Sequence, residues 1–344
     1  MASLGNPATR NRFSIFRRFT PLLTLFCALS LTSAMAPGLT AAQSWPNAAT
    51  ADDGARVTKE TWLDARTVDL QIDSPAIGAT GTVRLFVPAG WKAEPTRTWP
   101  TLYLLHGCCE PADYKSWDQF TDVKSFTADK DVIVVMPSDG PAGMYTRWWN
   151  FGLYEKPDWE AFHTEEVRQL VERSYRGGTQ RAVAGVSIGG YGALAYAFRK
   201  KGMFGAAASY SGIPNTLYPG AAGTIKGLLF RVGIYNPWAM WGDESSPVSK
   251  WAERNPYNHV DELRGTALYV SSGNGETGPL DPPGQSDPLD AMSEMTSRSF
   301  TDLLGQRGIP VTADYYGNGT HSWPYWERAL HNSWPVLAPA LGLS

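Results

Sequence analysis

The chain has 344 residues and a formal net charge of −3, with 43% hydrophobic and 18% charged residues. This composition supports a large buried core and excludes an intrinsically disordered chain. A net charge this small also argues against a nucleic-acid partner, because phosphate binding requires clustered lysine and arginine side chains.

The N-terminal residues have the order of features found in a secretory signal peptide. Four arginines between residues 10 and 18 precede an uncharged apolar run at residues 21–36, and small residues lead up to Ala42. We expect residues 1–42 to be a signal peptide and residues 43–60 to be a linker. The alternative is a retained membrane anchor, for which the run is short. The mature protein is expected to be secreted or held in the cell envelope, with the Sec and twin-arginine routes both open.

Short apolar runs alternate with helical segments over the rest of the chain, which favours a mostly parallel α/β sheet in a single domain at residues 61–344. Strands are expected at residues 67–73, 82–88, 101–105, 131–136, 181–185, 204–210, 267–271 and 311–316. Helices are expected at residues 159–175, 188–200, 289–306 and 324–334. We expect Pro335 to end the last helix, and residues 213–258 to form an insertion over the edge of the sheet.

A serine follows one of the expected strands in the pattern G-x-S-x-G. Residues 185–189 read Gly-Val-Ser-Ile-Gly and are followed by a helix rich in glycine and alanine. This is the setting of a nucleophile elbow, in which the serine lies on a tight turn from strand to helix. We therefore expect Ser187 to be a nucleophile; the alternative is an ordinary glycine-rich turn.

A serine nucleophile needs a histidine base, and the chain has five histidines. His321 follows the last expected strand on a loop, so it can reach the edge of the sheet at which Ser187 lies. The acid of an α/β-hydrolase precedes the histidine in the chain. The candidates by position are Asp281, Asp287, Asp290 and Glu294.

The loop after the strand at residues 101–105 is expected to complete the site. The backbone N–H groups of Cys108 and Ile188 are the expected oxyanion donors. His106 has no second metal ligand near it in the sequence, so it is expected to orient this loop or to contact substrate. Cys108 and Cys109 are the only cysteines after the expected signal peptide, so they either pair, with each other or between chains, or stay as free thiols.

Several blocks of the sequence resemble the antigen-85-type mycolyltransferases and their secreted esterase relatives. They include residues 103–107 (Tyr-Leu-Leu-His-Gly), 185–189, 240–242 (Met-Trp-Gly) and 319–326 (Gly-Thr-His-Ser-Trp-Pro-Tyr-Trp). The resemblance runs from about residue 60 to the end. It implies an α/β-hydrolase fold and an acyl-serine intermediate, whose acyl group passes to a sugar hydroxyl, trehalose in the best-known members, or to water.

The resemblance also assigns roles to individual residues. It makes Ser187 the nucleophile, His321 the base, and Cys108 and Ile188 the oxyanion donors. The acid of the family is a glutamate on the helix before the last strand. Alignment of that helix through Phe300 places Asp290 at this position, and Glu294, one turn later, is the alternative.

Trp323 matches an aromatic residue that lines the sugar pocket of the family. The mycolyltransferases have an acidic residue and an arginine that handle the sugar at the positions of His106 and Cys109. This departure makes the loop more similar to that of the secreted esterase branch.

We therefore expect a secreted serine esterase or acyltransferase that needs neither a cofactor nor a metal. Its donor is expected to be an acyl ester or glycolipid, and its acceptor water or a sugar hydroxyl. One rival is an enterochelin- or thioester-type esterase of the same fold. The other is a non-catalytic binding protein, against which the complete set of serine, histidine and acid argues.

Overall fold

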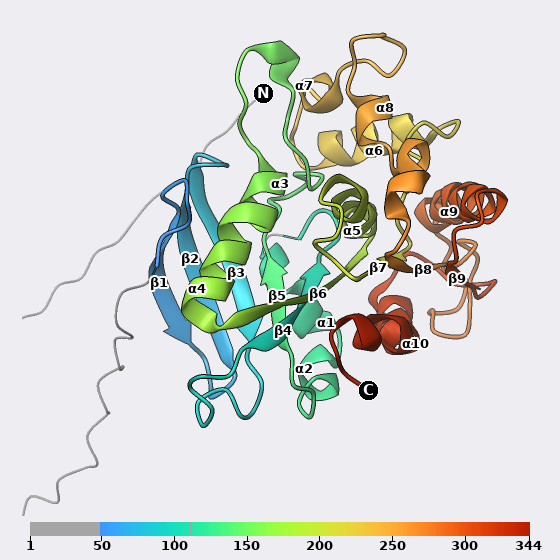
Figure 1. The fold of residues 1–344 in the computed structure, drawn as a ribbon. Helices are drawn as coiled ribbons and strands as arrows, with labels where there is room; N and C mark the ends of the chain where they lie inside the picture. Colours follow the sequence, from blue (N-terminus) through green and yellow to red (C-terminus); the bar gives the residue numbers. More distant parts are fainter. Residues whose placement is uncertain (1–48, 111) are drawn as a thin grey trace, which may run out of the picture. The chain divides into compact units, whose positions relative to one another are not determined.

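A nine-stranded sheet organises residues 49–110 and 112–344, which the computed structural model describes (Figure 1). The strand order is β1-β2-β3-β5-β4-β6-β7-β8-β9. The strands are β1 (Arg56–Trp62), β2 (Thr67–Ser74), β3 (Ala79–Phe86), β4 (Trp99–Leu105), β5 (Ile133–Pro137), β6 (Gly177–Val186), β7 (Ala206–Tyr210), β8 (Ala267–Ser272) and β9 (Thr312–Tyr315). Strands β1 to β3 are antiparallel and β3 joins β5 antiparallel, whereas β4 to β9 run parallel to one another.

Helices cover both faces of this sheet, as expected for parallel strands that are buried on both sides. The α-helices are α1 (Ser116–Phe120), α2 (Val123–Phe126), α3 (Trp159–Ala161), α4 (Arg168–Tyr175), α5 (Ile188–Arg199), α6 (Ala221–Arg231), α7 (Trp238–Trp241), α8 (Trp251–Arg254), α9 (Pro288–Gln306) and α10 (Trp323–Ala340). Segments of 3-10 helix lie at Asp113–Lys115, Asn150–Gly152 and Pro256–Leu263, and a π-helical turn at Phe162–Val167 joins α3 to α4.

The core has two parts, one on each face of the sheet. Apolar residues of α4, α5, α6 and α9 form one part, and residues of α1, α2 and α10 form the other. The residues of β5 and β7 are all buried, which explains why their sequences are unbroken runs of apolar and small residues. The segment at residues 213–258 supplies α6, α7 and α8, which Figure 1 shows grouped beside α5.

The expected linker at residues 43–60 is wrong over residues 56–60, which belong to β1. This strand lies at the edge of the sheet and most of its residues are exposed, so its sequence carries no clear apolar alternation. Residues 43–48 and the expected signal peptide lie outside the described residues. Within the described part of the chain, no helix has the length and hydropathy needed to cross a membrane.

The expected end of the last helix is also wrong, because α10 continues past Pro335 to Ala340. The rings of Pro335 and Pro339 are exposed, while Leu337 and Ala338 pack into the core beneath the helix. Burial of this face therefore outweighs the backbone hydrogen bonds that the two prolines cannot donate.

Candidate active site

Ser187 lies on the turn between β6 and α5 with φ of 55° and ψ of −121°, a backbone conformation that residues other than glycine rarely adopt. Its N–H donates a 2.9 Å hydrogen bond to the carbonyl of Tyr210 at the end of β7. A Cβ on Gly185 would collide with the backbone of Gly189, and one on Gly189 would collide with the carbonyls of residues 105 and 106. Both glycines of the motif are therefore required by close backbone packing.

His321 lies on the loop between β9 and α10, and its Nδ1 is 3.1 Å from Oδ1 of Asp290. The side chain of Asp290 is 0% exposed, and its other oxygen accepts a 2.9 Å hydrogen bond from the N–H of Gly273. Both carboxylate oxygens are thus engaged, which fixes the carboxylate and, through it, the imidazole. This arrangement leaves Nε2 of His321 available for proton transfer.

Contacts through Trp326 connect His321 to the turn of Ser187. The rings of His321 and Trp326 meet edge to face, with centroids 4.9 Å apart. The indole N–H of Trp326 donates to Oγ of Ser211 at 3.1 Å, and Ser211 directly follows Tyr210, which holds the backbone of Ser187. The structure therefore brings the serine and the histidine to the same edge of the sheet. No hydrogen bond joins the two side chains in the described residues, and such bonds often tighten only with substrate.

The remaining acid candidates have other partners. Glu294 forms an ion pair with Arg298 at 2.8 Å on the surface of α9. Asp287 caps the start of α9 by accepting a hydrogen bond from Leu289 N–H. Asp281 accepts hydrogen bonds from Thr320 and Tyr325, so it holds the loop before His321 rather than the imidazole.

The expected oxyanion donors lie on the loop after β4 and at the start of α5. Gly107 packs closely against the serine, since a Cβ built on it would lie 3.4 Å from Cβ of Ser187. Neither Cys108 N–H nor Ile188 N–H donates a hydrogen bond to any group in the described residues. Two free amide N–H groups beside a serine can donate hydrogen bonds to the oxyanion of a tetrahedral intermediate and stabilise its negative charge.

Cys108 and Cys109 are joined by a disulfide in the structure. Cys109 has a φ of 87°, and its N–H donates to the carbonyl of Pro141 at 3.0 Å. The disulfide and this hydrogen bond together restrain the loop that carries the Cys108 amide.

His106 is 1% exposed, so its ring lies inside the fold behind the oxyanion loop. Its Nδ1 is 2.6 Å from the carbonyl oxygen of Gly107, and its Nε2 is 3.1 Å from Oδ2 of Asp113. Burial alone would lower the pKa of His106, but the Asp113 and Asp139 carboxylates and the Gly107 carbonyl together outweigh this effect and raise the pKa above its ordinary value. This placement favours the loop-orienting role of His106 over contact with substrate.

Trp323 lies two residues after His321 and belongs to an aromatic cluster. Its ring stacks on Phe120 at 5.3 Å and meets Trp117 and Trp326 edge to face at 5.4 and 5.0 Å. Phe120 is exposed and Trp323 is half-buried, so the cluster presents an aromatic surface beside the imidazole.

Two contacts of the site were not expected from the sequence, namely those of Gly273 and Trp326. Gly273 directly follows β8, and its position at the carboxyl end of a parallel strand is the signal that could have identified it. Trp326 lies within the block at residues 319–326, but its contact with Ser211 depends on the packing of α10.

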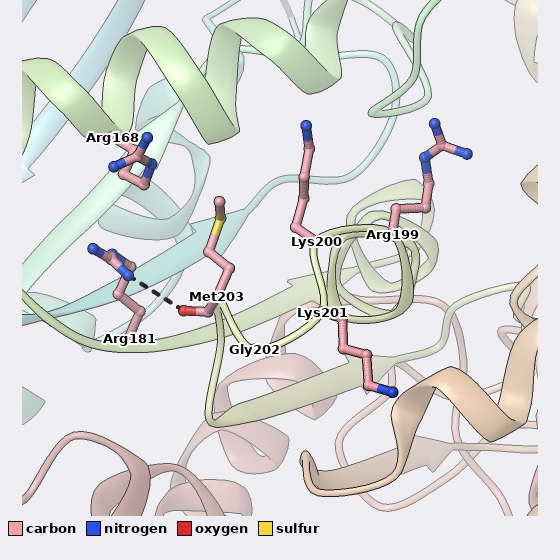
Figure 2. Close-up of a pocket in the computed structure, with 7 residues that line it drawn as sticks. All are labelled: Arg168, Arg181, Arg199, Lys200, Lys201, Gly202 and Met203. Atoms are coloured by element: carbon pink, nitrogen blue, oxygen red, sulfur yellow. Dashed lines mark hydrogen bonds between the residues drawn. The ribbon is translucent and has the colours of Figure 1, made fainter.

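A separate cavity of about 460 Å³ is lined by cationic side chains (Figure 2). They are Arg168, Arg181, Arg199, Lys200 and Lys201. All except Lys201 form ion pairs with Glu160, Glu165 or Glu172, so their charge is largely neutralised. Arg199 ends α5 and Ser187 precedes its first residue, so the cavity lies at the opposite end of this helix from the nucleophile. In the residues that the structure describes, no group of three metal-ligating side chains occurs.

Comparison with known proteins identifies the family. Residues 74–336 match the model of a family described as putative esterase. The chain is 30% identical over 263 residues to Esterase Rv1288 of Mycobacterium tuberculosis (strain ATCC 25618 / H37Rv). This alignment covers 75% of this chain and 56% of that protein. It is also 30% identical over 257 residues to the diacylglycerol acyltransferase/mycolyltransferase Ag85B of Mycobacterium avium, covering 71% of this chain and 76% of the relative.

Solved structures share the fold. The crystal structure of Mycobacterium tuberculosis MPT51 (FbpC1) matches with a TM-score of 0.68 and 24% identity over 81% of this chain and 100% of that one. An S-formylglutathione hydrolase from Agrobacterium tumefaciens matches with a TM-score of 0.62 and 15% identity, over 82% and 99% of the two chains. The predicted α/β-hydrolase fold is thereby confirmed. This chain spans only about half the length of Esterase Rv1288. The chain belongs to the esterase family that includes the antigen-85-type mycolyltransferases.

Proposed function

We propose that this protein is an exported serine esterase or acyltransferase that works through an acyl-Ser187 intermediate. The observation that carries the proposal is the strained turn of Ser187 at the same sheet edge as the hydrogen-bonded pair of His321 and Asp290. Export rests on the N-terminal sequence pattern alone.

In the first half of the reaction, Oγ of Ser187 attacks the carbonyl carbon of the ester while its proton passes to Nε2 of His321. The Asp290 carboxylate stabilises the imidazolium that forms, because it accepts the hydrogen bond from Nδ1. The N–H groups of Cys108 and Ile188 donate hydrogen bonds to the former carbonyl oxygen and stabilise its negative charge. Collapse of the intermediate breaks the bond to the alcohol, which leaves with the proton from His321.

In the second half, an acceptor hydroxyl attacks the acyl-serine. His321 removes its proton and returns it to Oγ of Ser187 as the new ester or the free acid departs. Water as acceptor gives hydrolysis, and a sugar hydroxyl gives transfer. The loop with His106 and Cys109 lacks the acidic residue and arginine of the mycolyltransferases, which supports hydrolysis.

Transfer to a sugar is the second candidate, and the aromatic surface of Trp323 and Phe120 supports it. The ring of Trp323 packs on Phe120 and on Trp326, which contacts His321, so the exposed part of this surface can stack on the apolar face of a sugar. Hydrolysis and transfer would then compete for the same acyl-enzyme.

The experiment is to mix the protein with p-nitrophenyl esters of increasing chain length and follow intact mass and product, with and without trehalose or glucose. We expect an acyl adduct on Ser187 that decays to free acid in water. A new sugar ester at the expense of the acid would identify transfer. Turnover without an adduct on Ser187, or no turnover with any ester, would contradict the proposal. Ser245→Ala, which changes an exposed loop serine, is the matched control.

A further inference from the structure

We propose that His106 is a positioning residue that holds the peptide between Gly107 and Cys108 with its N–H directed into the oxyanion hole. The inference rests on the proposed function, because it assigns His106 to the loop that would stabilise the intermediate on Ser187. It concerns the direction of a single backbone amide.

A hydrogen bond within the loop fixes the carbonyl of Gly107. Nδ1 of His106 lies 2.6 Å from the carbonyl oxygen of Gly107. A carbonyl oxygen can only accept, so Nδ1 carries the hydrogen. The C=O and N–H of a trans peptide point in opposite directions, so a fixed Gly107 oxygen also fixes the direction of the Cys108 N–H.

The partners of Nε2 determine which ring nitrogen of His106 carries the hydrogen. Nε2 of His106 lies 2.8 Å from the N–H of Asp139 and 3.1 Å from Oδ2 of Asp113. A neutral ring accepts from Asp139 N–H at Nε2, whereas a charged ring donates from Nε2 to Asp113. Both states keep the hydrogen on Nδ1 and therefore keep its bond to Gly107. The opposite tautomer would place the lone pair of Nδ1 against the Gly107 oxygen and leave Asp139 N–H without this acceptor.

The two neighbouring peptides of the loop are each held by a different hydrogen bond. The phenol of Tyr145 donates to the carbonyl of His106 at 2.9 Å, and Cys109 N–H donates to the carbonyl of Pro141 at 3.0 Å. Between these two anchors, the hydrogen bond from His106 is the one that holds the Gly107–Cys108 peptide. The Cys108 N–H itself has no protein acceptor in the described residues, which suits a donor kept for the intermediate.

The sharpest test compares His106→Asn with His106→Gln. The amide nitrogen of asparagine can take the place of Nδ1, whereas that of glutamine takes the place of Nε2. We expect kcat to fall by about 10²- to 10³-fold in His106→Gln, the loss seen when one oxyanion donor is removed, and KM to change little. The kcat of His106→Asn should stay within about tenfold of wild type. Equal values of kcat for the two variants, or a loss confined to KM, would overturn the inference.

His331→Asn and His331→Gln form the matched control pair, because His331 is exposed and bound only to Asp122 among polar groups of the described residues. Both should react as wild type does. Fluorophosphonate labelling separates the two proposals. If wild type is not labelled, the proposed function fails. If the His106 variants are labelled to completion but turn over at different rates, Ser187 is intact and the difference belongs to the oxyanion loop.

A measurement on the wild-type protein tests the inference even if the His106 variants fail to fold. In ¹⁵N-histidine-labelled protein, long-range ¹H–¹⁵N spectra report which ring nitrogen of each histidine is protonated. We expect His106 to carry its hydrogen on Nδ1, alone or with Nε2. A His106 protonated only on Nε2 would overturn the inference.

Discussion

Nδ1 of His321 lies 3.1 Å from Oδ1 of Asp290, a fully buried carboxylate whose second oxygen is held by the N–H of Gly273. The same helix carries Glu294 one turn later, but that carboxylate faces Arg298. Of the two acids that the family resemblance left as alternatives, Asp290 is therefore placed to orient the imidazole and Glu294 is paired with Arg298.

This difference predicts the effect of two matched substitutions. Asp290→Asn should lower kcat by about 10⁴-fold, because an amide at this position holds the imidazole in the wrong tautomer and cannot stabilise its charge. Glu294→Gln should change kcat by less than about twofold, because it removes only a surface ion pair. Steady-state hydrolysis of a p-nitrophenyl ester measures both. The reverse ranking would show that Glu294 is the acid.

The buried imidazole of His163 predicts a loss of stability in acid. It accepts a hydrogen bond from the phenol of Tyr196 at Nδ1 and donates one from Nε2 to the carbonyl of Ser138. Burial lowers the pKa of His163 to about 3, whereas the unfolded chain binds this proton near pH 6.5. The unfolded state therefore binds more protons below pH 6.5, and the free energy of unfolding falls with decreasing pH down to about pH 3.

Urea unfolding at a series of pH values checks this prediction. Removal of the titrating group in His163→Gln should reduce the slope of stability against pH by up to about 1.4 kcal/mol per pH unit in this window. His331→Gln, at an exposed position, should leave the slope as in wild type. Identical slopes for His163→Gln and wild type would mean that His163 is already protonated in the folded protein.

Reduction of the Cys108–Cys109 disulfide is predicted to slow turnover without removing the nucleophile. The bond restrains the loop that directs the Cys108 amide, so its loss should lower kcat by up to about 10²-fold, the scale of a misplaced oxyanion donor. Mild reductant, followed by assays of ester hydrolysis and fluorophosphonate labelling, measures the effect. The double variant Cys108→Ser, Cys109→Ser should be equally slow and insensitive to reductant. Addition of two alkyl groups to the unfolded, unreduced protein would show that the thiols are free.

The aromatic surface beside His321 predicts weaker use of a sugar acceptor in Trp323→Ala. Loss of one aromatic contact of about 0.5–1.5 kcal/mol should raise the acceptor KM by about two- to tenfold. Trp323→Phe should retain most of the effect of the ring, and Trp238→Ala, on α7, is the control. Transfer assays at several sugar concentrations report the acceptor KM. An unchanged acceptor KM in Trp323→Ala would exclude the ring from the acceptor site.

The sequence predicts the central strands well because residues buried on both faces form unbroken apolar runs, as in β5 and β7. Edge strand β1 gives no such signal, since it pairs on one side and most of its residues are exposed. The continuation of α10 past Pro335 depends on the burial of Leu337, which local rules for proline do not include.

The site likewise contains residues that the sequence predicts and residues whose roles depend on tertiary packing. Gly185 and Gly189 lie two positions before and two after Ser187, so the motif is visible in the sequence, although the clash that excludes a side chain at Gly189 is with the distant carbonyls of residues 105 and 106. Tertiary packing determines which carboxylate contacts His321, because four carboxylates lie at suitable positions in the chain. The inward position of His106 likewise follows from Asp113 and Asp139, whose contacts with the ring span 7 and 33 positions of the chain.

Fluorophosphonate labelling of wild type and Ser187→Ala, with ester hydrolysis measured on the same samples, tests the role of Ser187 directly. Wild type should be labelled at one site, identified as Ser187 by peptide mass spectrometry. Ser187→Ala should fold with an unchanged melting temperature, lose labelling and lose turnover by several orders of magnitude. Labelling of Ser187→Ala at the wild-type rate would contradict the assignment of Ser187 as the nucleophile.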